Sequence, residues 1–288
     1  MAEADDLFER GTAALQAGDK ASARELIRGA AELGRLDAAV IFANFVASGV
    51  GGPRHWQNGL AMLRGLAKVN RRSARELALI ERMALTDDGD PVSLPPAEPV
   101  CEAPHILAFR GLLSAEECAY LIEAGRPMLT PALIVDVKTG GQKRDPGRIS
   151  DGCGFTWPLE NPAVHALNRR IAAASGTAPE QGEPLQILRY GVGGEYKPHF
   201  DSIPGFANQR AYTMLVWLNE DYEGGETWFT EPKLALKGVV GDAVLFRNAG
   251  ADGRRDPLSA HAGLPVTAGE KLIASKWIRQ RAFEGGLG

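Results

Sequence analysis

The stretch 190-YGVGGEYKPHFD-201 decides how this chain is read, because it ends in an extended run that carries a histidine and an aspartate. In a strand, residues i and i+2 point to the same face, so the imidazole of His199 and the carboxylate of Asp201 would project side by side. One further histidine would complete a two-histidine, one-carboxylate set, which binds iron(II) and leaves other coordination positions open. The glycines before the strand are not a phosphate loop, since no helix follows them.

The candidate for the third ligand is His261. The chain contains five histidines, and the part after residue 185 holds just His199 and His261. A metal bound in this part of the chain would therefore take His261 as its remaining protein ligand.

Lys271 lies downstream, at the start of a predicted strand in which Ile273, Ser275 and Trp277 share its face. A lysine on an apolar, inward face needs an anionic partner. Tyr190 and Thr227 lie on neighbouring predicted strands, and a cation with hydroxyl donors can hold a small carboxylate in a buried pocket. These residues predict an anion pocket beside the metal.

The second half of the chain reads as short strands separated by turn signals, which is typical of a sandwich or jelly roll. The predicted strands cover 185–190, 195–200, 211–218, 226–229, 242–247 and 270–278. A strand at 105–109, a helix after the capping-box pattern 114-SAEE-117 and a helix from Pro162 to Ser175 precede them. Helices come first and strands later, so the fold class is α+β.

Residues 1–88 are predicted to be helical, and 89–104 form a proline-rich linker before a main domain at 105–284. An offset of 36 residues matches Gly29 with Gly65, Ile27 with Leu63 and Ala38 with Ala74. This weak repeat resembles Sel1/TPR-like helix pairs, although such arrays usually need three units. The helices either pack on the main domain or dock a protein partner. The glycine-rich segment 137–157 is predicted to be a lid.

Composition excludes several classes of protein. The net charge of −4 leaves no basic footprint for nucleic acid. No apolar run approaches the length of a membrane-spanning helix, and the first residues lack a signal-peptide pattern. The 3 cysteines are widely spaced without a CxxC pair, which argues against a disulfide framework or a zinc-thiolate site. A reducing cytoplasm is the location that this cysteine usage favours.

Several segments together resemble the prolyl-4-hydroxylase-type 2-oxoglutarate/iron(II) dioxygenases. The matching segments are 185-LQILRY-190, 196-YKPHFD-201, 210-RAYTMLVWLN-219, 223-EGGET-227, 241-GDAVLF-246, 256-DPLSAHAGLPV-266 and 269-GEKLIASKWIR-279. The resemblance covers about residues 105–280 and leaves out the N-terminal helices. It implies a double-stranded β-helix, the cupin-like jelly roll, with supporting helices.

The resemblance also implies a role for each matching residue. It makes His199, Asp201 and His261 the ligands of iron(II). Lys271 would pair with the distal carboxylate of 2-oxoglutarate. The remaining implied roles are hydrogen bonds to this cosubstrate from Tyr190 and Thr227, pocket walls at Trp277 and Thr213, contacts with the prime substrate from Arg210 and Tyr196, and a substrate-covering loop at Arg148 (148-RIS-150).

The implied reaction is hydroxylation of a C–H bond with iron(II), 2-oxoglutarate and O2, ascorbate acting as reductant and succinate and CO2 being released. The implied substrate is a prolyl residue of a protein or peptide. Another residue or a small molecule is an alternative substrate. A non-catalytic binding module with a vestigial metal site is a different class, and zinc hydrolysis would leave Lys271 and Thr227 unexplained. Each residue taken singly also fits an ordinary packing or surface role.

Overall fold

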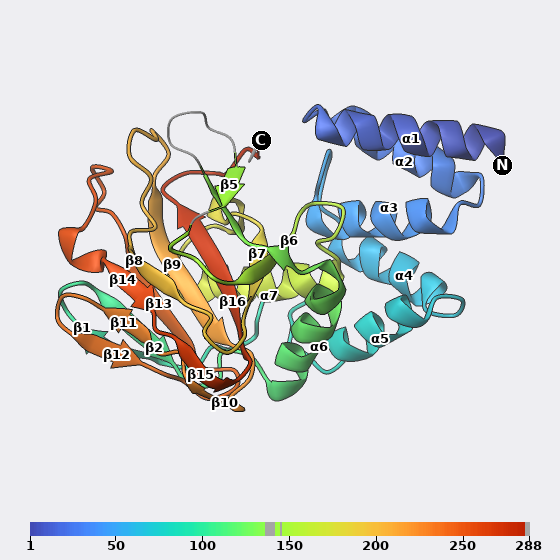
Figure 1. The fold of residues 1–288 in the computed structure, drawn as a ribbon. Coiled ribbons are helices and arrows are strands. Elements are labelled where there is room, and N and C mark those ends of the chain that lie inside the picture. The colour runs from blue at the N-terminus through green and yellow to red at the C-terminus, as the bar shows by residue number, and fades with distance from the viewer. Residues whose placement is uncertain (136–141, 145, 286–288) are drawn as a thin grey trace. The chain divides into compact units, whose positions relative to one another are not determined.

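The computed structural model describes residues 1–135, 142–144 and 146–285. Its backbone contacts divide the chain (Figure 1) into a helical unit, Met1–Ser93 with Phe155–Arg170, and a strand-rich unit, Leu94–Gly154 with the residues from Ile171 onward. Within the described residues, none of the helices has the length and apolar character that crossing a bilayer requires. The predicted boundaries at 1–88, 89–104 and 105–284 stay a prediction, and the grouping of 155–170 with the helices was not anticipated.

The helical unit confirms the helices predicted for the N-terminal part. They are α1 (Ala2–Gln16), α2 (Lys20–Glu32), α3 (Leu36–Ser48), α4 (Trp56–Leu66) and α5 (Arg71–Ile80). Asp19 caps α2 by accepting a hydrogen bond from the Ser22 amide, and Gly49 ends α3 in the left-handed conformation. Ile27, Ala30, Ala38 and Phe45 form a fully buried core.

The 36-residue offset corresponds to real helix pairs. Adding 36 to the bounds of α2 gives 56–68, which overlaps α4, and adding it to α3 gives 72–84, which overlaps α5. Helices therefore recur at this spacing, and the helix-pair repeat of the Sel1/TPR-like class stays a prediction. Helix α7 (Pro162–Ser175) starts as predicted with proline in its first turn, and the Asn161 side chain accepts a hydrogen bond from the Val164 amide.

The strand-rich unit contains two main sheets. One has the strand order β1-β2-β13-β9-β16-β7-β6-β3, the other β12-β11-β14-β8, and β10-β15 and β4-β5 form separate pairs. The strand bounds are β1 (Ala97–Cys101), β2 (Ile106–Phe109), β3 (Thr130–Pro131), β4 (Leu133–Val135), β5 (Gln142–Arg144), β6 (Asp151–Phe155), β7 (Leu185–Tyr190), β8 (Tyr196–His199), β9 (Arg210–Trp217), β10 (Tyr222–Gly224), β11 (Thr227–Phe229), β12 (Leu234–Leu236), β13 (Ala243–Arg247), β14 (His261–Gly263), β15 (Val266–Gly269) and β16 (Lys271–Arg279). All six strands predicted after residue 185 are present.

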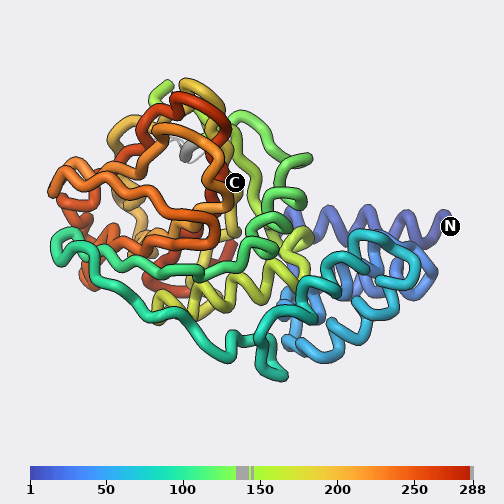
Figure 2. The backbone as a smooth tube through the Cα atoms, turned by 90° about the horizontal axis from the view of Figure 1, so that it is seen from below, coloured from blue at the N-terminus to red at the C-terminus, as the bar shows by residue number. Residues whose placement is uncertain are grey.

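The two sheets share one core, which is the feature that makes this unit a jelly roll. Phe229 of the smaller sheet meets Phe246 of the larger one edge to face, with ring centroids 5.1 Å apart. Leu188, Val244 and Ile273 add buried side chains from the larger sheet. Figure 2 shows the strands of this unit wrapped around a common interior. The predicted α+β class and jelly-roll fold are confirmed.

Helix α6 (Ala115–Gly125) has the predicted capping box, because Ser114 and Glu117 bond each other's backbone amides. Two loop predictions were wrong in part. The predicted linker contains β1, which pairs with β2 in the register Ala97↔Phe109, and the predicted lid contains β5 and β6. Residues 136–141 and 145 of that lid lie outside the described residues.

Candidate active site

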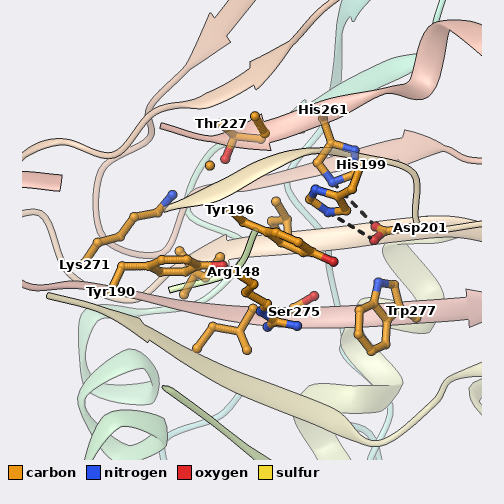
Figure 3. Close-up of a pocket in the computed structure, with 15 residues that line it drawn as sticks. Arg148, Tyr190, Tyr196, His199, Asp201, Thr227, His261, Lys271, Ser275 and Trp277 are labelled. Carbon is orange, nitrogen blue, oxygen red and sulfur yellow. Dashed lines mark ion pairs between the residues drawn. The ribbon is translucent and has the colours of Figure 1, made fainter. Parts of the chain in front are cut away.

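The metal-ligand candidates come together where β8 pairs with β14. The antiparallel register places His199 directly opposite His261, and their ring centroids are 4.3 Å apart. Asp201 follows β8 and turns back toward both rings (Figure 3), with Oδ1 3.7 Å from His199 Nε2 and Oδ2 3.7 Å from His261 Nε2. One ligand atom from each of these three residues lies within 4.8 Å of the others.

Both histidines present Nε2 to this common point. Nδ1 of His199 donates to the Lys197 carbonyl and Nδ1 of His261 donates to the Ser259 carbonyl, each at 2.9 Å. A carbonyl oxygen only accepts, so the proton is on Nδ1 and the lone pair of Nε2 is free for a metal. The 3.7 Å spacings are too long for hydrogen bonds. The donor atoms therefore fit an ion between them better than direct bonds to one another.

The surroundings of His199 and Asp201 favour their metal-binding forms. Burial, reinforced by the neighbouring His261, lowers the pKa of His199 to about 3, so its imidazole is neutral at neutral pH. Burial alone would raise the pKa of Asp201, but His261, His199 and Arg210 outweigh it and hold that pKa below its usual range. Neutral imidazoles and an ionised carboxylate are the donor set that iron(II) takes.

Lys271 lies at the other end of the pocket, opposite Tyr190 across the β16–β7 pair. Its side chain is buried, and Nζ donates to the Gly225 carbonyl at 2.6 Å. In the part of the chain that the structure describes, no carboxylate lies within ion-pair distance of this ammonium group. A buried ammonium that binds a neutral carbonyl has donors to spare for a ligand carboxylate. Burial lowers the pKa of Lys271 to about 8.

One pocket joins Lys271 to the metal-ligand candidates. Nine of the eleven predicted site residues line it: Arg148, Tyr190, Tyr196, His199, Asp201, Thr227, His261, Lys271 and Trp277. Leu188, Leu215 and Ile273 supply its apolar wall. Thr227 is buried and reaches the pocket from β11, the sheet opposite Lys271 and Tyr190. The pocket therefore has a cation at one end and three metal donors at the other, with the hydroxyl-bearing side chains of Tyr190 and Thr227 along its lining.

Tyr196 and Arg148 lie beside the metal-ligand candidates. The Tyr196 ring stacks on the His199 ring with centroids 3.5 Å apart, and the Arg148 guanidinium lies 4.9 Å from the Tyr196 centroid. Arg148 forms an antiparallel bridge with Tyr196 and donates to Ser150 Oγ at 3.0 Å. The predicted substrate-covering segment thus reaches the pocket.

Two predicted site residues, Thr213 and Arg210, are not among the residues that line the pocket. Thr213 lies behind Asp201 and donates to its Oδ2 at 2.6 Å. Arg210 is buried and pairs with both oxygens of Glu183 at 2.7 and 2.9 Å, with its guanidinium 3.5 Å from the centroid of the Trp277 ring. Its donors are used within the fold, which corrects the expectation that it faces substrate. Trp277 lies beside Asp201, away from Lys271, so it walls the metal end of the pocket.

Sequence reasoning missed Glu183 and Asn248. Glu183 is fully buried between Arg210 and Arg279, and Asn248 is fully buried next to Thr213. No motif marks either residue. The sequence signal for Glu183 was its position, because only Pro184 separates this acid from the buried strand that begins at Leu185.

A jelly roll that gathers two histidines, an aspartate and a buried lysine around one pocket defines a class, the 2-oxoglutarate-dependent iron(II) oxygenases. Residues 185–279 match the family model of the 2OG-Fe(II) oxygenase superfamily. Prolyl 4-hydroxylase 1 of Arabidopsis thaliana is 38% identical over 245 residues, covering 78% of this chain and 86% of that protein. Prolyl 4-hydroxylase 5 of the same plant is 32% identical over 76% of this chain and 84% of its own length.

A solved structure has the same fold. The 2OG complex of the viral collagen prolyl hydroxylase from Paramecium Bursaria Chlorella virus-1 superposes with a TM-score of 0.51 at 27% identity, covering 63% of this chain and 99% of that one. This chain belongs to the prolyl 4-hydroxylase family of the 2OG-Fe(II) oxygenase superfamily. It is a dioxygenase that uses iron(II) and 2-oxoglutarate.

We expect 2-oxoglutarate binding to depend on pH through Lys271. A ligand carboxylate would pair with the ammonium form, so binding should be strongest below the Lys271 pKa of about 8 and weaken as pH rises through it. The expected loss approaches about tenfold in affinity per pH unit above that pKa. Anaerobic calorimetry of the iron-loaded protein with 2-oxoglutarate measures it. Lys271→Met is the control and should bind weakly at every pH. Equal pH slopes in the two proteins would contradict the prediction.

Proposed function

We propose that this enzyme hydroxylates a prolyl residue within a protein or peptide. In this reaction 2-oxoglutarate, O2 and the substrate C–H bond become succinate, CO2 and the alcohol. The relationship to prolyl 4-hydroxylases carries the proposal. Tyr196 and Trp277 support it, because two aromatic side chains beside Asp201 and His199 (Figure 3) give the metal end of the pocket an apolar lining suited to a pyrrolidine ring.

The side chains divide the work along the pocket. Lys271, with the hydroxyls of Tyr190 and Thr227, would bind the distal carboxylate of 2-oxoglutarate and orient its other end toward the metal. Leu188, Leu215 and Ile273 would exclude water from that path. His199, Asp201 and His261 would hold iron(II), which, when bound with its cosubstrate, supplies the oxidising chemistry that the side chains themselves lack.

Proline specificity is tested with peptides that differ at one position. The iron-loaded protein is incubated with 2-oxoglutarate, O2 and a proline-containing peptide or its alanine counterpart, and mass spectrometry locates added oxygen. We expect one oxygen on the prolyl ring, one succinate formed per hydroxylation, and no reaction of the alanine peptide. Oxygen on another residue would reassign the substrate. Oxygen found only on a small molecule would favour the alternative function.

We also propose that the helical unit docks the protein substrate. Leu33 and Leu36, at the connection between α2 and α3, are 52% and 44% exposed, and neighbouring exposed leucines suit an apolar contact. The double substitution Leu33→Ser/Leu36→Ser should raise KM for a folded protein substrate and leave a short peptide unaffected. Val69→Ser is the control, because Val69 is an even more exposed apolar residue (73%) in the same unit, after α4. Equal KM values in all variants would reduce these helices to a scaffold. Substitution is preferable to deleting residues 1–88, because 155–170 group with that part of the chain.

Two further proposals concern the surroundings of the enzyme. The three cysteines are free thiols, which supports a reducing, cytoplasmic location. Cell fractionation tests this location, and recovery outside the cytoplasm would refute it.

Ascorbate is proposed as the reductant that restores iron(II). Its omission should shorten the time over which turnover stays linear without changing the initial rate.

A further inference from the structure

A chain of two hydrogen bonds runs from Asn248 through Thr213 to Asp201. Asn248 Nδ2 donates to Thr213 Oγ1 at 2.7 Å, and Thr213 Oγ1 lies 2.6 Å from Asp201 Oδ2. The exposed fractions of the three residues are 0%, 1% and 6%, so water does not compete for these bonds.

The direction of donation in this chain is fixed by chemistry. An amide NH2 group only donates, so Oγ1 of Thr213 accepts from Asn248 and its single proton goes to Asp201. The ionised carboxylate only accepts. One oxygen of Asp201, Oδ2, is therefore held by a short, charge-assisted hydrogen bond.

We call the chain Asn248–Thr213–Asp201 the relay. The backbone holds its first two residues in place independently of any ligand. Thr213 lies in β9 opposite Phe246 of β13, and Asn248 follows directly after β13. The backbone N–H of Asn248 donates to the Ala211 carbonyl at 2.7 Å. The backbone carbonyl of Asn248 accepts from the Asp256 N–H at 2.9 Å. Thr213 is therefore held by the β-sheet and Asn248 by two backbone hydrogen bonds just beyond it, which is the kind of support that a metal ligand needs.

Stabilising the sheet does not by itself explain why an asparagine side chain is buried at position 248. Its Oδ1 atom has no hydrogen-bond partner among the described residues, and a buried, unpaired acceptor destabilises a fold. The donor role of Nδ2 toward Thr213 does account for it, because Asn248 keeps the threonine proton pointed at Asp201.

We propose that Thr213 and Asn248 are positioning residues that hold Asp201 Oδ2 and leave Oδ1 as the oxygen that binds the metal. A carboxylate held in this way would offer mainly Oδ1 to a metal, and so would leave room there for 2-oxoglutarate and O2. The inference rests on the assignment of Asp201 as an iron ligand. A sequence pattern could not show it, because the relay joins residues from three separate segments.

The test uses cobalt(II), whose visible spectrum reports its coordination, in the full-length protein. Thr213→Val removes the hydroxyl with little change of shape, and it should weaken cobalt(II) and iron(II) affinity by about 10- to 100-fold and alter the cobalt spectrum. Thr213→Ser keeps the hydroxyl and should restore both. Asn248→Ala, one bond further from the carboxylate, should shift both properties in the same direction by less.

Thr230→Val is the matched control. Its hydroxyl donates to the Ala260 carbonyl at 3.2 Å in the same unit and has no contact with Asp201, so metal affinity should stay at the wild-type value. Thermal melting of the metal-free variants checks that each is folded. Wild-type affinity and spectrum in Thr213→Val and Asn248→Ala, with only a lower melting temperature, would overturn the relay. Failure of the wild-type protein to bind cobalt(II) would instead refute the metal site, and the relay with it.

Discussion

We expect Asp201→Ala to abolish iron(II) binding and 2-oxoglutarate turnover in a protein that still folds. Asp201 would supply the anionic ligand, and its loss would leave two imidazoles that offer a divalent cation no charge compensation. The Asp201 carboxylate accepts a hydrogen bond from Thr213. Removing the carboxylate breaks this side-chain bond and leaves the hydrogen bonds between the strands in place, so the variant should still fold. Anaerobic calorimetry with iron(II), followed by a succinate assay in the presence of substrate, measures both effects.

Asp201→Glu is the companion variant for this prediction. It keeps the charge and moves the carboxylate by one methylene, so we expect weakened iron(II) binding and severely reduced turnover. Substrate-dependent succinate production at the wild-type rate in Asp201→Ala would show that the reaction does not use this metal site.

Glu183→Ala produces the largest expected loss of stability. Glu183 is fully buried and is the carboxylate that pairs with both Arg210 and Arg279, which are 6% and 3% exposed. Burial already lowers the pKa of Arg279, more than Glu183 raises it, so loss of the Glu183 charge would leave that guanidinium without its ion-pair partner. Removing one partner from a buried ion pair costs about 3–5 kcal/mol, because the remaining charge is left without compensation.

Urea unfolding of the metal-free protein, followed by tryptophan fluorescence, measures this loss. Glu98→Ala is the control, because Glu98 and Arg110 form an ion pair whose side chains are 50% and 63% exposed. Such a surface pair contributes about 0–1 kcal/mol. Equal losses in the two variants would show that the buried cluster does not support the fold. Glu183→Ala should also impair turnover in folded protein, since Arg210 packs on the ring of Trp277.

The metal-ligand candidates were predictable because their pattern is local or scarce. His199 and Asp201 are two residues apart in a predicted strand, and His261 was the one other histidine after residue 185. Lys271 stood out as a cation on an apolar strand face. The His199–Asp201 pair and the apolar face of Lys271 both follow from strand periodicity, which the sequence shows directly.

The contacts that only the strand order creates could not be predicted. Strand β16 lies between β9 and β7, and this order makes Trp277 the neighbour of Thr213 and brings Arg210 within reach of Glu183. A buried, ion-paired arginine and a substrate-facing arginine look alike in sequence. Strand β1 was read as linker for a similar reason, because its pairing with β2 outweighs a proline-rich composition.

Tracing labelled O2 is the measurement that tests the central claim most directly. The iron-loaded enzyme, 2-oxoglutarate and a proline-containing peptide are incubated under isotopically labelled O2, and peptide and succinate are weighed by mass spectrometry. A dioxygenase site built from His199, Asp201, His261 and Lys271 predicts one labelled oxygen in succinate and one in the hydroxylated peptide, and neither in Asp201→Ala. Product oxygen that comes from water, or label retained in Asp201→Ala, would contradict the assignment of this pocket.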